Sequence, residues 1–290
     1  MLIAVNTRLL IPGKLNGIGW FTYETLKRIT TGHPEHEFLF LFDRPVPEEF
    51  VFSSNIEPLY LFPPARHPFL WYWWFEYSVR KILEAKKPDL FLSPDGYLCL
   101  STNTVSVPVI HDINFFHRKE DIPFLARHYY LRQFPKFARK ACRIATVSEY
   151  TKEDIRTSYG IDPEIIDVVY NGANSMYVPL NEETRRKTKE SFSEGEDFFL
   201  FVGSLHPRKN LANLLLAFDG YRKASSRKMK LVIVGEQLFK TGKTFRVYRE
   251  MSHRKDVIFT GRQPVEKLQY IMGSAFALVL VSFYEGFGIP

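Results

Sequence analysis

The chain has 290 residues, of which 45% are hydrophobic and 24% charged, with a formal net charge of +7. This composition can bury large cores, and the length is typical of two globular domains of roughly 100 to 200 residues each. The charge predicts an anionic partner, while a membrane span is excluded because no apolar run reaches the ~20 residues that a spanning helix needs. Polar residues follow Met1 too early for a signal peptide, so we expect a cytoplasmic protein. Two cysteines, Cys99 and Cys142, are too few for a disulfide framework, and we expect both to be buried.

Short β-branched or aromatic runs alternate with helical patterns along the chain, which indicates βαβ units on parallel sheets. One series of strands is expected at residues 2–6, 38–42, 59–62, 90–93, 107–111, 144–148 and 166–170, and a second at 198–202, 231–234, 257–260 and 277–281. Turn residues at 171–174 and a charged helical stretch at 182–190 separate the two series. We predict an α/β protein of two doubly wound parallel-sheet domains, residues 1–172 and 173–290, the second incomplete.

The first strand leads into a glycine loop, PGKLNGIGW, before a helix. Gly17 and Gly19 would let the backbone approach a ligand closely. The pattern falls short of the dinucleotide fingerprint G-x-G-x-x-G because Thr22 stands at its last position.

Aromatic residues are dense at 69–77, FLWYWWFEY, and again among the basic residues of 115–143. Core packing is the expected role of the first run. The alternative is an interfacial surface that enters a lipid headgroup region together with the basic stretch.

His111 and Asp112 end a predicted strand, at the sheet edge where open α/β sheets bind ligands. His111 could hydrogen-bond a sugar hydroxyl or a reacting oxygen, although such a pair is also common as a structural feature. No D-x-D pair occurs, so a carboxylate site for Mg²⁺ or Mn²⁺ is not indicated.

The strongest local pattern is FFLFVGSLHPRKNLANLLLAF, residues 198–218. A strand ends at Gly203, a short loop carries Arg208 and Lys209, and Asn210 takes the helix N-cap position before an amphipathic helix. Helix amides and two cations directed at one point would hold a phosphate, and the alternative is a solvated basic loop.

Taken in order, GIGWFTYETL, VPVIHD, IATVSEYTKEDI, VVYNGAN, FVGSLHPRKNL, LVIVGE, VIFTG and SFYEGFGIP resemble the motifs of the retaining GT-B glycosyltransferases of family 4. The resemblance covers essentially the whole chain. It implies two Rossmann-like domains facing a cleft, and transfer of a sugar from a nucleotide-sugar co-substrate with retention. No further cofactor and no obligatory metal are implied.

The resemblance also implies roles for individual residues. The donor diphosphate would be bound by Arg208 and Lys209 with Gly203 and Ser204, where Ser204 replaces a frequent arginine of the family. Catalytic contacts to the donor sugar would come from His111 and from Glu285, the first carboxylate of the E-x7-E motif. The amides of Gly286, Phe287 and Gly288 would face sugar hydroxyls, and Gly17 and Gly19 would form a loop beside the phosphates and acceptor.

The second glutamate of that motif would fall at position 293, beyond Pro290, so we expect a truncated transferase with weak or no turnover. The donor stays open between GDP-mannose and UDP-sugars. The expected acceptor is a glycan or lipid-linked molecule of cell-surface polysaccharide synthesis, with a peripheral contact at the inner membrane face.

Two other functions remain open. One is an NAD(P)-dependent Rossmann oxidoreductase, which the incomplete glycine fingerprint disfavours. The other is a non-catalytic basic binding protein that stacks single-stranded nucleic acid on residues 115–143. Under the transferase hypothesis no nucleic acid is expected as a partner.

Overall fold

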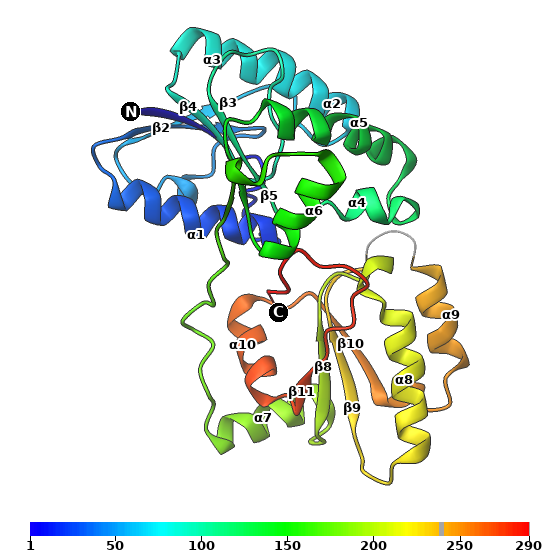
Figure 1. Ribbon diagram of the computed structural model, residues 1–290. Helices are drawn as coiled ribbons and strands as arrows, with labels where there is room; N and C mark the ends of the chain where they lie inside the picture. Colours follow the sequence, from blue (N-terminus) through cyan, green and yellow to red (C-terminus); the bar gives the residue numbers. More distant parts are fainter. Residues whose placement is uncertain (238–240, 290) are drawn as a thin grey trace. The chain divides into compact units, whose positions relative to one another are not determined.

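The computed structural model describes residues 1–237 and 241–289, so residues 238–240 and Pro290 lie outside the described part. The chain divides into two compact units between Asn171 and Gly172, one residue before the predicted boundary. Each unit is an α/β structure built on its own sheet (Figure 1).

The first unit contains a seven-stranded, wholly parallel sheet in the order β3-β2-β1-β4-β5-β6-β7. This is the doubly wound order, in which the chain direction across the sheet reverses between β1 and β4. The strands are β1 Leu2–Asn6, β2 Glu37–Phe42, β3 Ile56–Tyr60, β4 Leu90–Ser93, β5 Ser106–Ile110, β6 Ile144–Thr146 and β7 Ile166–Val168. All seven predicted strands are present; β3 begins three residues early and β6 and β7 are shorter than predicted.

Helices cover both faces of this sheet, as the doubly wound order requires. Leu26 of α1 packs with Val5, Phe38 and Phe40 on one face. The opposite face, with Leu39, packs against α2, α3 and α5, so the central strands are buried on both sides. The helices are α1 Gly17–Gly32, α2 Pro68–Trp73, α3 Arg80–Lys86, α4 Asn114–His117, α5 Phe124–Lys140 and α6 Glu149–Tyr159, with a π-helical turn at Trp74–Val79 and 3-10 turns at Glu48–Phe50, Lys119–Asp121 and Pro163–Ile165.

The second unit contains a four-stranded parallel sheet in the order β10-β9-β8-β11. Its strands are β8 Phe198–Val202, β9 Lys230–Val234, β10 Val257–Gly261 and β11 Ala277–Leu278. One face packs on α8 Leu211–Ala224 and α9 Gly242–Glu250, and the other on α7 Glu182–Ser193 and α10 Val265–Ser274. The switch point of this sheet lies between β8 and β11. The prediction of two doubly wound parallel sheets is therefore confirmed.

Two expectations about apolar residues need correction. Cys99 is buried, but Cys142 is exposed. The aromatic run 69–77 is only half core: Trp74 and Phe75 are buried, whereas Trp73 is 52% exposed. Because the run passes from α2 into the π-helical turn, it presents aromatic rings on more than one side. No helix of the described residues is both long and apolar enough to cross a bilayer.

Candidate functional site

The basic loop of the second unit lies at the carboxyl end of β8, beside the switch point. It forms a 3-10 turn, Pro207–Lys209, that His206 caps by accepting the Arg208 amide at Nδ1, 3.2 Å away. This turn places Arg208 and Lys209 on the edge of the sheet where α/β folds bind ligands. Both side chains are largely buried, Arg208 being 18% and Lys209 11% exposed.

Glu285 meets both cations. Its Oε2 lies 2.8 Å from Nη1 of Arg208, and its Oε1 lies 2.5 Å from Nζ of Lys209. The same Arg208 nitrogen donates to the Tyr284 carbonyl at 2.7 Å, and the Arg208 carbonyl accepts the Phe283 amide at 2.9 Å. Arg208 and Lys209 therefore join the loop after β8 to the loop after β11 by two ion pairs and two hydrogen bonds.

Asn210 occupies the helix N-cap position, but its side chain does not cap the helix. It adopts a left-handed conformation with φ of 61°, and its Nδ2 donates to the Val281 carbonyl at 3.0 Å. The predicted cap is therefore wrong in its chemistry. The side chain binds the loop after β11 instead, which leaves the first turn of α8 without a side-chain cap.

Gly203 directly follows β8 and contacts Gly235, which directly follows the neighbouring strand β9. A Cβ atom on Gly235, which has φ of 153°, would lie 1.9 Å from the Gly203 carbonyl oxygen. Only glycine allows the two strand ends this approach. The close packing therefore requires glycine at position 235. The predicted role of Gly203 and of the neighbouring Ser204 in diphosphate binding stays a prediction.

The remaining residues predicted for the donor sugar follow Glu285 directly. Gly286 is buried, Phe287 is 42% exposed, and Gly288 has φ of 89°, a conformation that favours glycine. Their position beside the ion pairs agrees with a common site, while their contacts to a sugar remain a prediction.

The ion pairs determine the protonation of Glu285. Burial by itself would raise the pKa of this carboxyl, but the Arg208 charge and the hydrogen bond from Lys209 outweigh it and hold the pKa below its ordinary value. A lowered folded-state pKa stabilises the protein above the ordinary value of 4.5, and this stability is lost as the pH falls through the folded-state pKa.

We therefore expect the stability difference between the wild type and Glu285→Gln to be constant from pH 8 to 6 and to shrink below about pH 4. Urea denaturation midpoints across this range measure it. Asp197, Asp219 and Asp256 also have lowered pKa values, so only the difference between the two proteins reports Glu285. A difference that is the same at pH 7 and pH 3 would contradict the ion pairs.

His111 lies in the first unit, directly after β5. Its Nε2 lies 2.8 Å from the Pro94 carbonyl, the ring of Phe21 meets it edge-on at 4.8 Å, and its own carbonyl accepts the Thr151 hydroxyl. Desolvation lowers the pKa of His111, although the Pro94 bond and the nearby Asp112 and Asp95 oppose this. The imidazole is therefore neutral at pH 7, and it can accept a proton or hydrogen bond without first losing one.

The two glycines of the glycine loop have different surroundings. Gly19 is buried, its amide donates to Asn16 Oδ1 at 2.8 Å, and a Cβ there would lie 3.0 Å from the Leu9 carbonyl. Its small size thus serves the packing of α1. Gly17 is exposed at the first position of that helix, with open space around it. The role of both glycines beside phosphates and acceptor stays a prediction.

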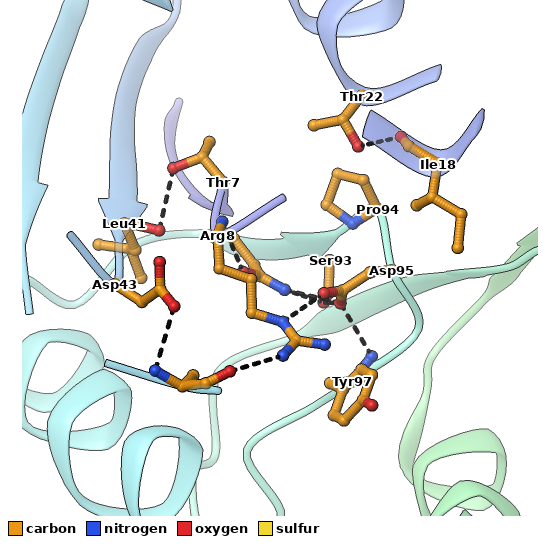
Figure 2. Close-up of polar contacts among 12 residues, drawn as sticks. Thr7, Arg8, Ile18, Thr22, Leu41, Asp43, Ser93, Pro94, Asp95 and Tyr97 are labelled. Atoms are coloured by element: carbon orange, nitrogen blue, oxygen red, sulfur yellow. Dashed lines mark hydrogen bonds and ion pairs between the residues drawn. The ribbon is translucent and has the colours of Figure 1, made fainter. Parts of the chain in front are cut away.

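Beside the switch point of the first unit lies a buried cluster that was not predicted from the sequence. Arg8, which follows β1, pairs with Asp95, which follows β4, and Nε lies 2.5 Å from Oδ2 (Figure 2). The guanidinium lies over the Tyr97 ring at 4.1 Å, and Asn6 Nδ2 donates to Asp95 Oδ1 at 2.7 Å. An arginine and an aspartate, each two residues past the end of one of two adjacent strands, were the available signal.

One group among the described residues brings three potential metal ligands together. His33, Glu35 and His36 place their ligand atoms within 4.8 Å of one another. They lie between α1 and the start of β2, at the amino edge of the sheet, opposite the edge that holds His111. Two of the three are exposed, so this group is separate from the candidate site.

Comparison with known proteins decides the family. The model of Glycosyltransferase Family 4 matches residues 15–175, more than half of the chain, and the model of Glycosyl transferases group 1 matches residues 182–290. The chain belongs to glycosyltransferase family 4. Its fold is accordingly GT-B, as the resemblance implied.

Individual relatives of this family 4 protein are distant. It is 28% identical over 228 residues to the O-antigen chain mannosyltransferase RfbU of Salmonella typhimurium, covering 77% of this chain and 58% of RfbU. The chain spans about half the length of the curated relatives it matches.

Solved structures share the fold at low identity. The sucrose-phosphate synthase of Thermosynechococcus elongatus has a TM-score of 0.75 at 15% identity, covering 99% of this chain and 77% of its own. HepE of Anabaena, solved with UDP and glucose, has a TM-score of 0.69 at 16% identity, covering 99% of this chain and 76% of its own.

Proposed function

We propose that this family 4 protein transfers a sugar from a nucleotide-sugar donor to a glycan or lipid-linked acceptor. The observation that carries the proposal is the meeting of Arg208, Lys209 and Glu285 at the β8–β11 switch point. Two buried cations suit a leaving diphosphate, and an adjacent ionised carboxylate suits a sugar centre that develops positive charge.

In this proposal the bond between the anomeric carbon and the donor phosphate breaks, and a bond to the acceptor oxygen forms on the same face, which gives retention. The acceptor proton passes to the departing phosphate oxygen. Arg208 and Lys209 stabilise the charge on that phosphate, with Gly203 and Ser204 nearby. Glu285, the amides of residues 286–288 and the neutral His111 contact the sugar.

The relatives favour one substrate class. RfbU is an O-antigen chain mannosyltransferase, and HepE was solved with UDP and glucose. We propose a hexosyl donor of the GDP-mannose or UDP-sugar type, used at the cytoplasmic side in cell-surface polysaccharide synthesis. No metal is proposed for the step, since the two cations supply the positive charge that a metal would otherwise provide.

A panel of sugar nucleotides tests this function by thermal shift and by release of the nucleoside diphosphate. With the chain extended past residue 290, we expect one GDP- or UDP-sugar to raise the melting temperature and to be turned over, and we expect turnover to be unchanged after dialysis against EDTA. Loss of turnover that Mg²⁺ or Mn²⁺ restores would overturn the metal-independent step. A thermal response to NAD(P) alone would favour an oxidoreductase.

One structural feature counts against each of the two alternatives, the oxidoreductase and the nucleic-acid-binding protein. A ten-residue connection, residues 7–16, joins β1 to α1, whereas a dinucleotide fingerprint needs a tight turn there. In the basic stretch 115–143, Phe115, Phe134 and Phe137 are buried and cannot stack on bases.

A second proposal concerns the membrane and rests on an exposed aromatic patch, which we define as Phe62, Phe69, Tyr72, Trp73 and Tyr77. Phe62 and Phe69 are 73% and 70% exposed. The rings of Trp73 and Tyr77 stack at 4.4 Å, and Ser78 donates to the Phe62 carbonyl, which joins the two ends of the patch. Exposed Arg66 and Lys81 lie beside it in sequence. We infer that the patch lies on an anionic lipid surface, where aromatic rings and cations both gain contacts.

Flotation with vesicles of phosphatidylglycerol and phosphatidylcholine tests this surface. Two half-exposed aromatic rings contribute about 2 kcal/mol together, so Trp73→Ser/Tyr77→Ser should lower vesicle binding more than about tenfold. Tyr270→Ser, which removes a 42% exposed ring from the second unit, should leave binding unchanged. Absence of wild-type flotation at low salt would contradict the proposal.

A further inference from the structure

The switch point of the first unit holds a connected set of polar residues that ends at His111. Adjacent strands β1, β4 and β5 contribute one part each at their carboxyl ends. Asn6 is the last residue of β1 and Arg8 follows two residues later, the turn 93–96 begins at the last residue of β4, and His111 directly follows β5. The set therefore crosses the centre of the sheet toward the residue that we propose to contact substrate.

The middle part is a tight turn with the sequence Ser-Pro-Asp-Gly. The Gly96 amide donates to the Ser93 carbonyl at 3.2 Å, with Pro94 and Asp95 at the central positions. Proline at the second position and glycine at the fourth are typical of a type I turn. Gly96 has φ of 85°, and a Cβ there would lie 3.1 Å from the Phe134 ring, so other residues are disfavoured.

Asp95 fastens this turn to β1. Its Oδ2 accepts from Arg8 Nε at 2.5 Å, and its Oδ1 accepts from the Ser93 hydroxyl at 3.2 Å (Figure 2). The same Oδ1 accepts from Asn6 Nδ2 at 2.7 Å. Arg8 is itself held, because it donates to the Ala65 carbonyl and lies over the Tyr97 ring. Arg8 and Asp95 are only 8% and 4% exposed, so water does not compete for these bonds.

The consequence appears one residue away, at the Pro94 carbonyl. This oxygen can only accept a hydrogen bond, so Nε2 of His111, 2.8 Å away, must carry the proton. Nδ1 of the neutral ring is then an acceptor, and it has no hydrogen-bond partner within the part of the chain that the structure describes.

We propose that Asn6, Arg8 and Asp95 are positioning residues that hold the Pro94 carbonyl against His111, so that the imidazole presents an unprotonated Nδ1 to a substrate hydroxyl. The identity of that hydroxyl as a sugar or acceptor group rests on the proposed function. The choice of tautomer does not rest on the proposed function, because it depends only on bonds within the first unit. A histidine in the other tautomer would offer an N–H and could not accept from the hydroxyl.

The test is ¹⁵N NMR of histidine-labelled protein, with His111→Gln to assign the signal. In the wild type we expect a single neutral tautomer with the proton on Nε2 and a pKa below the ordinary value of 6.5. A signal with the proton on Nδ1 would overturn the proposal, whatever the variants do. This readout needs no turnover, so failure of the transferase function would be seen separately.

Two variants examine the positioning residues. Arg8→Met/Asp95→Asn removes both charges together, so that no buried charge is left alone, and Asn6→Ala leaves the ion pair intact. We expect each to convert the single tautomer into a mixture. The double variant should also lower the His111 pKa further, because the Pro94 bond and the Asp95 charge both raise it. Asp112, the other charged group that acts on the ring, is retained in both variants.

Asp121→Asn is the matched control. It breaks another largely buried pair of the same unit, where Arg118 Nε lies 2.5 Å from Asp121 Oδ2. This control should lose stability without changing the His111 tautomer. In a transfer assay the double variant should lose about 10²-fold through misplacement of the imidazole, and the control should not. If His111 kept the wild-type tautomer in both Asn6→Ala and the double variant, Asn6, Arg8 and Asp95 would contribute to folding alone and not to the position of His111.

Discussion

Lys209→Ala is expected to lower transferase turnover by about 10²- to 10³-fold, the usual loss when one preorganised donor to a developing anion is removed. Its ammonium lies 2.5 Å from Glu285, and the Lys209 side chain is 11% exposed. Binding of the nucleoside diphosphate product should weaken as well. Initial rates and calorimetric titration with UDP or GDP measure the two effects.

Lys230→Ala is the matched control for this variant. Its side chain is also 11% exposed and ion-paired, with Glu194 at 2.6 Å and Asp256 at 3.2 Å. Lys230 begins β9, however, so it lies at the opposite edge of the same sheet. We expect Lys230→Ala to lower the stability of the protein without lowering the turnover of sugar transfer. Equal turnover losses in the two variants would mean that Lys209 acts through folding.

Glu285→Gln should bind diphosphate more tightly and transfer sugar more slowly. The carboxylate contacts both cations, and therefore competes with any anion that approaches them. Removing one charge at this distance from a diphosphate, with the high effective dielectric of a partly exposed site, is worth about 1–2 kcal/mol, or about tenfold in the Kd for pyrophosphate. Turnover should fall by about 10²-fold, because the sugar centre loses its neighbouring negative charge.

The opposite directions of these two effects make the prediction specific. Glu266→Gln removes the same charge from an exposed position at the start of α10 and should change neither quantity. Weaker pyrophosphate binding in Glu285→Gln would show that the carboxylate orders the cations for the anion instead of competing with it.

The two switch points of this protein are occupied in different ways. In the second unit the cations face a single carboxylate on a loop, and that carboxylate is 19% exposed. In the first unit Arg8 and Asp95 are almost wholly buried under aromatic rings. An anion can compete for the cations of the second unit. The buried pair of the first unit is suited to holding neighbouring residues in place.

Local patterns in the sequence were sufficient to predict the strands and their division into two sheets. Strand and helix periodicity depend on neighbours a few residues apart, and continuous apolar strands such as residues 38–42 indicate burial on both faces. The motif order likewise identified the family and placed Arg208, Lys209 and Glu285 in one predicted site. The bounds of short strands were less certain because β6, β7 and β11 end where pairing with a neighbour ends.

Only the tertiary structure decided how the site residues are paired. Glu285 and Arg208 are 77 residues apart, too far for a local sequence pattern to pair them. They meet because β8 and β11 are neighbours. The same holds for Arg8 and Asp95 across β1 and β4, and for the carbonyl that sets the His111 tautomer. Sequence determined which chemical groups end the strands, and the strand order determined which of them touch.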